Sequence, residues 1–241
     1  IDRGGTAELK ERFVRPAALG ERIGALGVTE PDAGSDVGAI STRAVRQGDE
    51  YVVNGSKTFI TNGTIADFVT TAVRTGGPGP RGISLLVIPT DTPGFTKGRR
   101  LKKLGAHVSD TAELAFEDCR VPASNLVGAE NDGFRLIMQG FEGERLVLAI
   151  ICVSQMRLMW QEAQRWGHER NIFGKPILAM QVWRHRLADA LTTIEAAAAL
   201  NHRAIDLYVG GEPCNGPISM AKLFASEAVV KVSHDCAQIF G

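Results

Sequence analysis

The stretch M-Q-G-F-E-G-E-R, residues 138–145, runs directly into the apolar segment L-V-L-A-I-I-C-V, residues 146–153. Apolar residues continue through Trp160 with only a few polar residues between them, which is too long a run for an ordinary strand. This pattern predicts a buried helix, and the rest of the fold is organised around it.

Two glycines and two carboxylates lie in the first turns of that predicted helix. Gly140 and Gly143 each cost a helix interior about 1 kcal/mol relative to alanine. Glycines this close together let another group approach the backbone, and Glu142, Glu144 and Arg145 would then face that group. The alternative is a kink or a junction between two helices, with both glutamates solvated.

Composition excludes several functional classes. The 241 residues are 44% hydrophobic and 22% charged, which is typical of an ordinary globular protein. Lys+Arg and Asp+Glu number 27 each, so no overall field favours nucleic acid or an anionic membrane. The basic run Lys97–Lys103 lacks interleaved aromatic residues and is better interpreted as a solvated loop or strand edge. No apolar run is long enough to cross a bilayer.

Cysteine and histidine patterns predict neither disulfides nor a metal site. The four cysteines are scattered without a C-x-x-C pair, which predicts reduced, buried or semi-buried thiols in a reducing compartment. The histidines show no i, i+4 pair. The pattern at Ser219–Phe240 is helical up to Gly241, so we expect the chain to be the middle of a longer polypeptide. Bacterial cytoplasm and mitochondrial matrix both stay open as compartments.

Residues 24–121 have the character of a β-domain. Asn54-Gly55 stands between two β-prone runs and predicts a hairpin turn. Further predicted strands are Phe68–Val73, Ile83–Ile88 and Thr111–Phe116. The glycine-rich stretch Gly76–Gly82 contains prolines and is not followed by a helix, so it predicts a flexible hairpin loop rather than a phosphate loop. Short strands at this spacing predict a small antiparallel barrel or sandwich.

After Pro122 the pattern becomes helical. Long helices are predicted from Gly133 to about Trp166, over Ala179–Val209, and from about Pro217 onward, and short connections predict an antiparallel bundle. A helical segment at Leu9–Leu19, without a convincing cap, precedes the β-domain. The predicted class is α+β, with a remnant of an N-terminal helical domain at 1–22, a middle β-domain at 23–129 and an incomplete helical bundle at 130–241.

Several motifs occur together in one order. Thr29–Asp36 reads T-E-P-D-A-G-S-D, residues 54–63 read N-G-S-K-T-F-I-T-N-G, and residues 170–177 read R-N-I-F-G-K-P-I. Pro93-Gly94-Phe95, Lys103-Leu104-Gly105 and Phe116–Pro122 lie between them. Together with Gln238–Gly241, these motifs resemble those of the acyl-CoA dehydrogenase family over nearly the whole chain. The resemblance implies a flavoprotein with a β-domain between helical domains.

The resemblance also implies the position of the catalytic base. Many members use a glutamate in a C-terminal E-G-T loop, which does not occur in these 241 residues. A minority, similar to isovaleryl-CoA and long-chain acyl-CoA dehydrogenases, place the base on the helix after the β-domain, within a motif like L-x-x-E-R-L. Residues 141–146, F-E-G-E-R-L, fit that motif and place the base at Glu144. The E-G-T loop is the alternative location.

The remaining site residues follow from the same resemblance. FAD contacts are implied at Leu26, Val28, Thr29, Gly34, Ser35, Phe59, Ile60 and Thr61, and, toward the FAD of a neighbouring subunit, at Arg170, Phe173, Gln181, Gln238 and Gly241. Substrate contacts along the CoA ester are implied at Ser35, Glu142 and Arg145. Phe59 stands where many members have tryptophan, and a stacking role survives that exchange.

The implied reaction is FAD-dependent α,β-dehydrogenation of an acyl-CoA thioester to the trans-2-enoyl-CoA. Glu144 would remove the α-proton and the flavin would accept the β-hydride. The implied partners are the acyl-CoA substrate, electron-transferring flavoprotein as electron acceptor, and further copies of the chain in a homo-oligomer built as a dimer of dimers. Alternatives are a flavin-dependent monooxygenase or oxidase on the same scaffold, or a catalytically silent FAD- or CoA-binding homologue.

Overall fold

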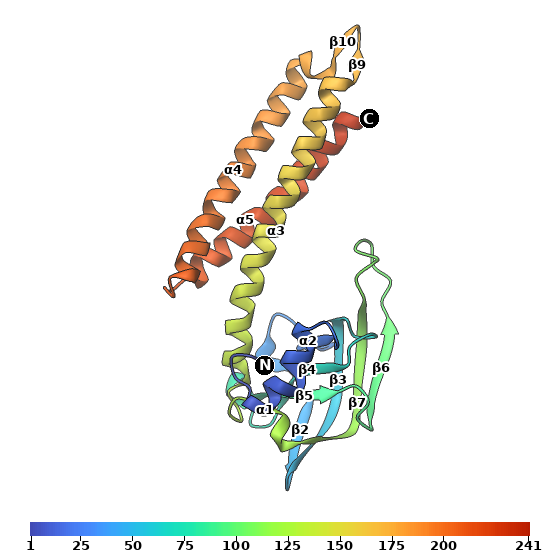
Figure 1. Ribbon diagram of the computed structural model, residues 1–241, viewed down its shortest axis with the longest axis vertical. Helices are drawn as coiled ribbons and strands as arrows, with labels where there is room; N and C mark the ends of the chain where they lie inside the picture. The colour runs from blue at the N-terminus through green and yellow to red at the C-terminus, as the bar shows by residue number, and fades with distance from the viewer. The chain divides into compact units, whose positions relative to one another are not determined.

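The computed structural model describes all residues from 1 to 241, which form two compact units, Ile1–Met138 and Gln139–Gly241. The first unit is a β-sheet with a short helical segment, and the second consists of long helices (Figure 1). The predicted α+β class is therefore confirmed. None of the helices has both the length and the apolar character that a bilayer crossing requires.

The N-terminal helical segment is continuous from Ala7 to Ala18. It comprises α1 (Ala7–Leu9), a π-helical turn (Lys10–Val14) and α2 (Arg15–Ala18). Thr6 caps it, because its hydroxyl accepts the backbone N–H of Leu9 at 3.2 Å. The expectation of an uncapped start was therefore wrong. Leu9 and Phe13 are buried, and the Phe13 ring lies 5.1 Å from that of Phe68.

Eight strands form one sheet in the first unit. Their bounds are β1 (Gly24–Gly27), β2 (Arg43–Gln47), β3 (Glu50–Thr61), β4 (Phe68–Arg74), β5 (Ile83–Pro89), β6 (Phe95–Arg100), β7 (Thr111–Pro122) and β8 (Leu126–Val127). The order is β6-β7-β3-β2-β4-β5-β8, with β1 pairing beside β4. Most pairs are antiparallel, but β1 and β2 each run parallel to β4. We expected a small antiparallel barrel or sandwich; the strands form an open path, so the barrel alternative is wrong.

The predicted turn at Asn54-Gly55 is also wrong. These residues lie inside β3, which continues past them and pairs with β7 through a bulge between Val53 and Gly55. Gly55 has φ +145°, and a Cβ there would meet the Thr42 hydroxyl oxygen at 2.6 Å. The glycine therefore allows β3 to approach Thr42, the residue directly before β2. The hairpin turn lies instead at Gly48-Asp49, between β2 and β3.

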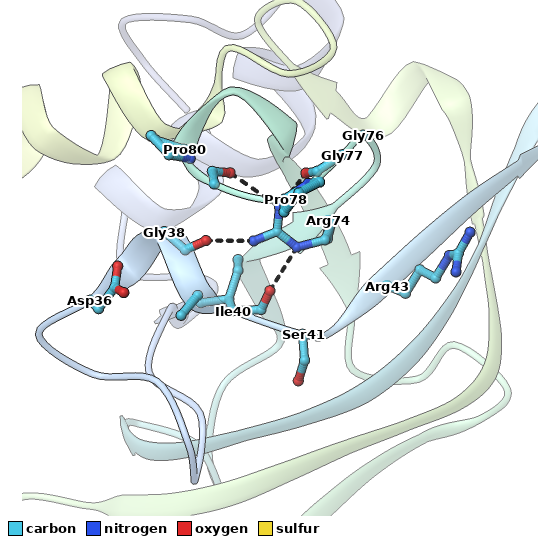
Figure 2. A pocket seen from close by; sticks show the side chains of 12 residues that line it. Asp36, Gly38, Ile40, Ser41, Arg43, Arg74, Gly76, Gly77, Pro78 and Pro80 are labelled. Atoms are coloured by element: carbon cyan, nitrogen blue, oxygen red, sulfur yellow. Dashed lines mark hydrogen bonds between the residues drawn. The ribbon is translucent and has the colours of Figure 1, made fainter.

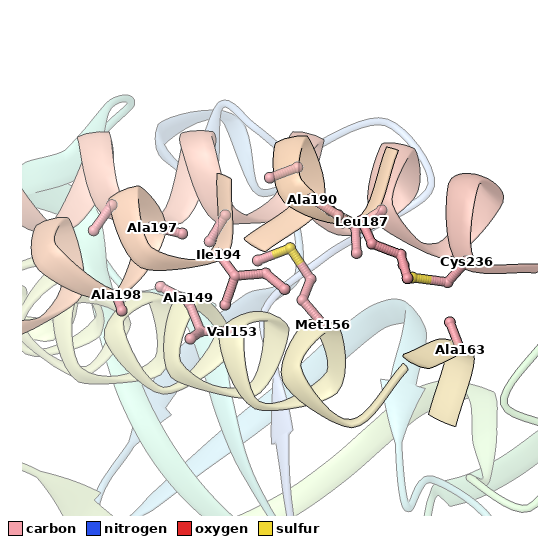
Figure 3. Packing of buried hydrophobic residues seen from close by; sticks show 14 of the residues in the cluster. Ala149, Val153, Met156, Ala163, Leu187, Ala190, Ile194, Ala197, Ala198 and Cys236 are labelled. Atoms are coloured by element: carbon pink, nitrogen blue, oxygen red, sulfur yellow. The ribbon is translucent and has the colours of Figure 1, made fainter. Parts of the chain in front are cut away.

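Three long helices form the second unit. Helix α3 (Gly133–Glu169) begins in the first unit and extends into the second, followed by α4 (Gln181–Val209) and α5 (Asn215–Ala237). All three were predicted, with ends within a few residues of those observed. Figure 3 shows their core, in which Met156 and Val153 of α3 pack with Leu187 and Ile194 of α4. The Trp160 indole N–H donates to the Leu187 carbonyl at 2.8 Å and ties α3 to α4.

Small residues allow the three helices to pack closely. Ala149 and Ala163 on α3, Ala190 and Ala197 on α4, and Ala225 on α5 are all buried. A helix rich in buried alanine can lie close to its neighbours without losing contact between side chains. The alanine run at residues 196–199, which looks featureless in the sequence, thus supplies part of the bundle core.

Candidate functional site

The T-E-P-D-A-G-S-D loop follows β1 and lies beside β3. Its first half is closed by reciprocal backbone hydrogen bonds between Glu30 and Ala33, at 2.8 and 3.3 Å. The backbone N–H of Thr58 on β3 donates to the Thr29 carbonyl at 2.9 Å. Two segments that are almost thirty residues apart are therefore held together, and both carry residues predicted to contact FAD.

The residues of the first unit that were predicted to contact FAD differ in their exposure to solvent. Val28 and Ile60 are buried, and Thr29 is half-buried. Leu26, Gly34, Ser35, Phe59 and Thr61 are exposed. The structure thus presents two apolar side chains and two hydroxyls from β1, the loop and β3, a combination that fits one face and the polar edge of a flat ring system such as isoalloxazine.

Phe59 is presented by a β-bulge. The register of β3 against β7 shifts between Lys57 and Ile60, and Phe59 has φ +58° with 67% of its surface exposed. A bulky residue at positive φ costs free energy, and a bulge turns a side chain away from the regular alternation of a strand. An unfavourable backbone and an exposed aromatic ring at one position indicate a functional constraint on Phe59.

A buried ion pair behind this bulge was missed by the sequence analysis. The Lys57 ammonium lies 2.7 Å from a Glu30 carboxylate oxygen, and both side chains are almost fully buried. Burial lowers the pKa of Lys57 to about 8 despite the attraction of Glu30. Burial would raise the pKa of Glu30, but Lys57 and hydrogen bonds from Ser41 and Thr42 lower that pKa to about 2. Both residues stand in motifs quoted above, but spacing alone did not indicate that they pair.

A cavity of about 800 Å³ lies at the end of the T-E-P loop, where Asp36 is part of its lining (Figure 2). Asp36 and Ser41 line it from one side and Gly76–Pro80 from the other. The Arg74 guanidinium donates to the carbonyls of Ile40, Gly38, Gly77 and Gly79 at 2.6–3.1 Å and joins the two sides. The glycine-rich stretch is therefore a β4–β5 hairpin connection, as predicted, and it is tied down by Arg74.

Arg43 also lines this cavity and contributes a second guanidinium. Its side chain is exposed and makes no hydrogen bond or ion pair within the chain. A guanidinium with free donors at the wall of a cavity suits an anionic oxygen, such as that of a phosphate.

The carboxylates of residues 138–145 lie on an uninterrupted helix, so the alternative of a junction between two helices is wrong. Glu144 is exposed, Glu142 and Arg145 are half-buried, and the Arg145 guanidinium lies 5.7 Å from the centre of the Phe141 ring. Desolvation raises the pKa of Glu144, against the opposing effect of Arg145. A carboxyl with a raised pKa is better suited to accept a proton than an ordinary one.

The two helix glycines differ in their surroundings. A Cβ at Gly143 would lie 3.1 Å from the Tyr208 hydroxyl, whereas a Cβ at Gly140 would meet nothing within 4 Å. At Gly143 the group that approaches the helix backbone closely is therefore Tyr208 of the same chain. The surface at Gly140 is open.

The residues predicted to contact the FAD of a neighbouring copy lie at one end of the helical unit, beyond the last turn of α3. Arg170 follows α3, and its backbone N–H donates to the Trp166 carbonyl at 2.8 Å. The Trp166 ring stacks on Phe240 at 5.6 Å, which brings the segment Gln238–Gly241 to the same end of α3. Gln238 and Gly241 are exposed.

A two-residue turn displays Phe173 at this end of the bundle. It joins β9 (Asn171–Ile172) to β10 (Lys175–Pro176), and both Phe173 and Gly174 have positive φ, as tight hairpin turns require. Phe173 is 93% exposed. The exposed Arg170 guanidinium beside it fits a pyrophosphate, and the bare ring fits a planar group, so these residues fit a dinucleotide such as FAD.

Gln181 begins α4 after the short helical turn Ile177–Ala179. It lines a cavity of about 390 Å³ with Arg184, His185, Ala188 and Asp189. Gln181 and Phe173 thus flank the same short segment of chain, and their exposed side chains are available to a ligand.

Two family models match most of the chain. Residues 25–119 match the middle domain of acyl-CoA dehydrogenases, and residues 131–241 match their C-terminal domain. Among curated relatives, an acyl-CoA dehydrogenase of Bacillus subtilis is 40% identical over 238 residues, covering 98% of this chain and 63% of the relative. The mouse long-chain specific acyl-CoA dehydrogenase, a mitochondrial protein, is 39% identical over 240 residues, covering 98% and 56%.

Solved structures agree with these matches. A probable acyl-CoA dehydrogenase from Mycobacterium abscessus is 51% identical with a TM-score of 0.98, covering all of this chain and 64% of that one. The FAD complex of PigA is 30% identical with a TM-score of 0.96, covering 99% and 63%. This chain therefore spans somewhat less than two thirds of the length of the proteins it matches.

Proposed function

Because this chain belongs to the acyl-CoA dehydrogenase family, we propose that it acts in the FAD-dependent α,β-dehydrogenation of an acyl-CoA thioester to the trans-2-enoyl-CoA. The order and completeness of the family motifs over both units support this activity. FAD, when bound, supplies the acceptor for the β-hydrogen as a hydride. The residues of this chain have to bind the reactants, orient them and remove the α-proton.

Glu144 is the proposed base because of its place in the F-E-G-E-R-L motif near the start of α3, and the raised pKa of its carboxyl agrees with that role. An α-proton of a thioester is only weakly acidic, so a carboxylate whose own proton affinity is increased removes it more readily. Within residues 138–145, Glu144 also stands next to Gly143, and it belongs to the F-E-G-E-R-L motif. Desolvation by a bound thioester would raise this pKa further.

FAD would be held by two sets of residues. In the first unit, Leu26, Phe59 and Thr61 offer exposed apolar surface and a hydroxyl for the ring system. In the second unit, Arg170, Phe173, Gln181, Gln238 and Gly241 would contact the FAD of a neighbouring copy, with Arg170 on the pyrophosphate. This division makes a homo-oligomer, a dimer of dimers, part of the proposal.

The CoA ester would be contacted by Ser35, Glu142 and Arg145. The cavity beside the T-E-P loop adds a place for the phosphate-bearing end of CoA, because Asp36 of its wall directly follows Ser35 and the Arg43 guanidinium is free. Electron-transferring flavoprotein is the proposed electron acceptor. The bacterial and mitochondrial relatives support either the bacterial cytoplasm or the mitochondrial matrix as compartment.

Anaerobic reduction of the flavin tests the activity and the base together. The natural FAD-containing protein is mixed with a panel of acyl-CoA thioesters, and the flavin absorbance is followed. We expect bleaching by at least one thioester, and we expect Glu144→Gln to bind that thioester without bleaching. The matched control is Glu142→Gln, which should raise the thioester concentration for half-maximal rate while the limiting rate is kept.

Three outcomes would contradict the proposal. Unchanged bleaching in Glu144→Gln would move the base elsewhere, for example to an E-G-T loop. Rapid oxygen consumption by the reduced flavin would favour an oxidase or monooxygenase. A colourless natural protein would favour a silent homologue.

A further inference from the structure

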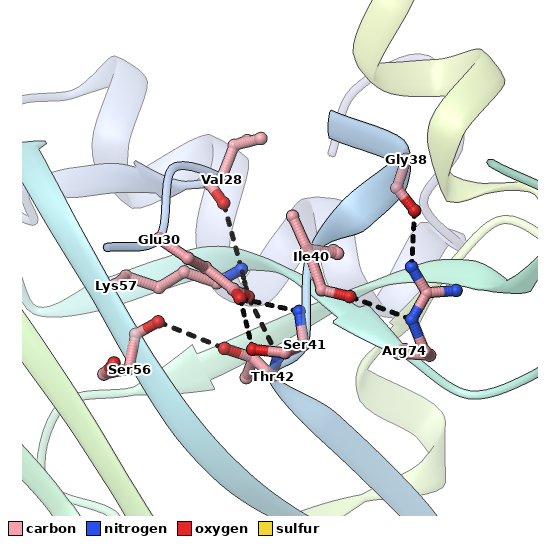
Figure 4. A network of polar contacts seen from close by, with 9 residues as sticks. All are labelled: Val28, Glu30, Gly38, Ile40, Ser41, Thr42, Ser56, Lys57 and Arg74. Atoms are coloured by element: carbon pink, nitrogen blue, oxygen red, sulfur yellow. Dashed lines mark hydrogen bonds and ion pairs between the residues drawn. The ribbon is translucent and has the colours of Figure 1, made fainter. Parts of the chain in front are cut away.

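The buried pair Lys57–Glu30 is the centre of a polar network in the first unit (Figure 4). One carboxylate oxygen of Glu30 accepts the Ser41 N–H at 2.6 Å and the Ser41 hydroxyl at 2.8 Å. The other oxygen accepts the Thr42 N–H at 2.9 Å and the Lys57 ammonium at 2.7 Å. The carboxylate is thus fully used, and each of its donors comes from a segment other than its own.

Lys57 closes the network from the strand. Its ammonium also donates to the Val28 carbonyl at 3.0 Å, the residue that leads into the T-E-P loop. Its aliphatic stem passes Gly27, where a Cβ would lie 3.5 Å from the Lys57 Cγ. One lysine therefore fixes both the end of β1 and the start of the loop against β3.

The network is important for the segments that it joins rather than for its contribution to the stability of the fold. A buried ion pair stabilises a fold little compared with apolar residues of the same volume, because both charges lose their hydration. What it does supply is one defined arrangement of the segments that it joins. Here these segments are the T-E-P loop, the two residues directly before β2 and the part of β3 directly before the bulge at Phe59.

We propose that Lys57 and Glu30 are positioning residues for the flavin site, which hold the T-E-P loop and the Phe59 bulge in the arrangement that receives the ring. This inference rests on the proposed function. Lys57 is two residues from Phe59 and Glu30 follows Thr29, so a loss of the pair would free both groups of predicted FAD contacts at once. The strained φ of Phe59 can persist because the residues before it are held in place.

The test uses the FAD-containing natural protein with the double substitution Glu30→Gln and Lys57→Met, which removes both charges and nearly preserves volume. We expect a folded protein whose dissociation constant for FAD is raised by about tenfold or more, since small displacements in a binding site cost this much. The flavin absorption bands should shift, and the limiting rate of flavin reduction should fall while the KM for acyl-CoA stays close to its original value.

The matched control is the double substitution Glu50→Gln and Arg120→Met. This pair joins the far end of β3 to β7 at 3.4 Å, and both of its side chains are exposed. It should leave FAD affinity and the flavin spectrum unchanged. A purely structural role for Lys57–Glu30 predicts lower thermal stability of the apoprotein without the change in FAD affinity or spectrum, and that result would overturn the proposal.

A milder variant decides the question if the double variant does not fold. Ser41→Ala removes one hydroxyl donor from Glu30 and keeps the ion pair. We expect a smaller loss of FAD affinity with the same direction of spectral shift, and an unchanged affinity would overturn the proposal. A natural protein that binds no FAD at all would instead refute the proposed function, so the two failures are distinguishable.

Discussion

The Glu30–Lys57 pair of the β-unit and the Glu144 carboxylate of the helical unit lie in opposite surroundings. In the β-unit, the Glu30 and Lys57 side chains are buried and form an ion pair with each other. In the helical unit, Glu144 is exposed, and its carboxyl has a raised pKa rather than a lowered one. The contrast shows two uses of a carboxylate. A carboxylate with every acceptor position filled holds segments in place, whereas one with open positions is available to an arriving proton.

The largest expected effect comes from breaking the buried pair. Glu30→Ala leaves the Lys57 ammonium buried without its counter-ion and should lower the free energy of unfolding by about 3–5 kcal/mol. Glu195→Ala in the helical unit removes the partner of Arg157 from an exposed pair and should cost less than about 1 kcal/mol. Urea denaturation of both variants checks this difference, and equal losses would remove the contrast between the units.

Lowering the pH should change the contributions of Glu30 and Glu144 to the stability of the protein in opposite directions. The folded pKa of Glu30 is about 2, below its ordinary 4.5, so its contribution to stability is complete above pH 4.5 and is lost as the pH falls toward 2. Glu144 has a raised pKa, so its contribution is present at low pH and is lost as the pH rises through that pKa. Urea midpoints measured from pH 6 to pH 3 should fall less steeply in the Glu30→Gln, Lys57→Met variant than in the natural protein. An identical slope would contradict the assignment.

Two glycine substitutions should have opposite effects on stability. Gly55→Ala places a Cβ against Thr42 at φ +145° and should destabilise the β-unit by more than about 1 kcal/mol. Gly140→Ala meets open space on a helix and should stabilise the helical unit by about 1 kcal/mol. Thermal unfolding of both variants checks the signs. Destabilisation by Gly140→Ala would indicate an unseen close neighbour at that position.

The smallest effect concerns the two exposed phenylalanines at positive φ. Phe59→Gly and Phe173→Gly should each raise the free energy of unfolding by about 1 kcal/mol, because glycine adopts this φ without strain and little buried surface is lost. Both should weaken FAD binding, which fluorescence titration of the apoprotein measures. A less stable variant would show that the phenylalanine backbone is not strained at that position. A variant that binds FAD as well as the natural protein would show that the phenylalanine does not contribute to FAD binding.

Much of the fold could be predicted from periodicity. The three long helices and the strands at residues 68–73, 83–88 and 111–116 follow from apolar spacing, which acts locally along the chain. The capping hydroxyl of Thr6 is equally local and was missed, although a threonine before a helical pattern is a known start signal.

Long-range contacts explain the remaining errors. Asn54-Gly55 has strong turn propensity, but the contact with Thr42 places the glycine inside a strand. The open path of the sheet runs from β6 to β8, and the parallel pairing of β1 with β4 lies beside that path; no local pattern encodes either pairing. Glu30 and Lys57 were both within recognised motifs, yet their pairing required the fold to bring two distant segments together.

The partners of Arg74 have a consequence for the rate at which ligands arrive. All four of its acceptors are neutral backbone carbonyls, so they hold the guanidinium without cancelling its charge. With Arg43 and a single carboxylate, Asp36, the cavity wall keeps a net positive charge. An anionic molecule should therefore be drawn toward this cavity from solution, and raising the ionic strength should slow its encounter with the protein.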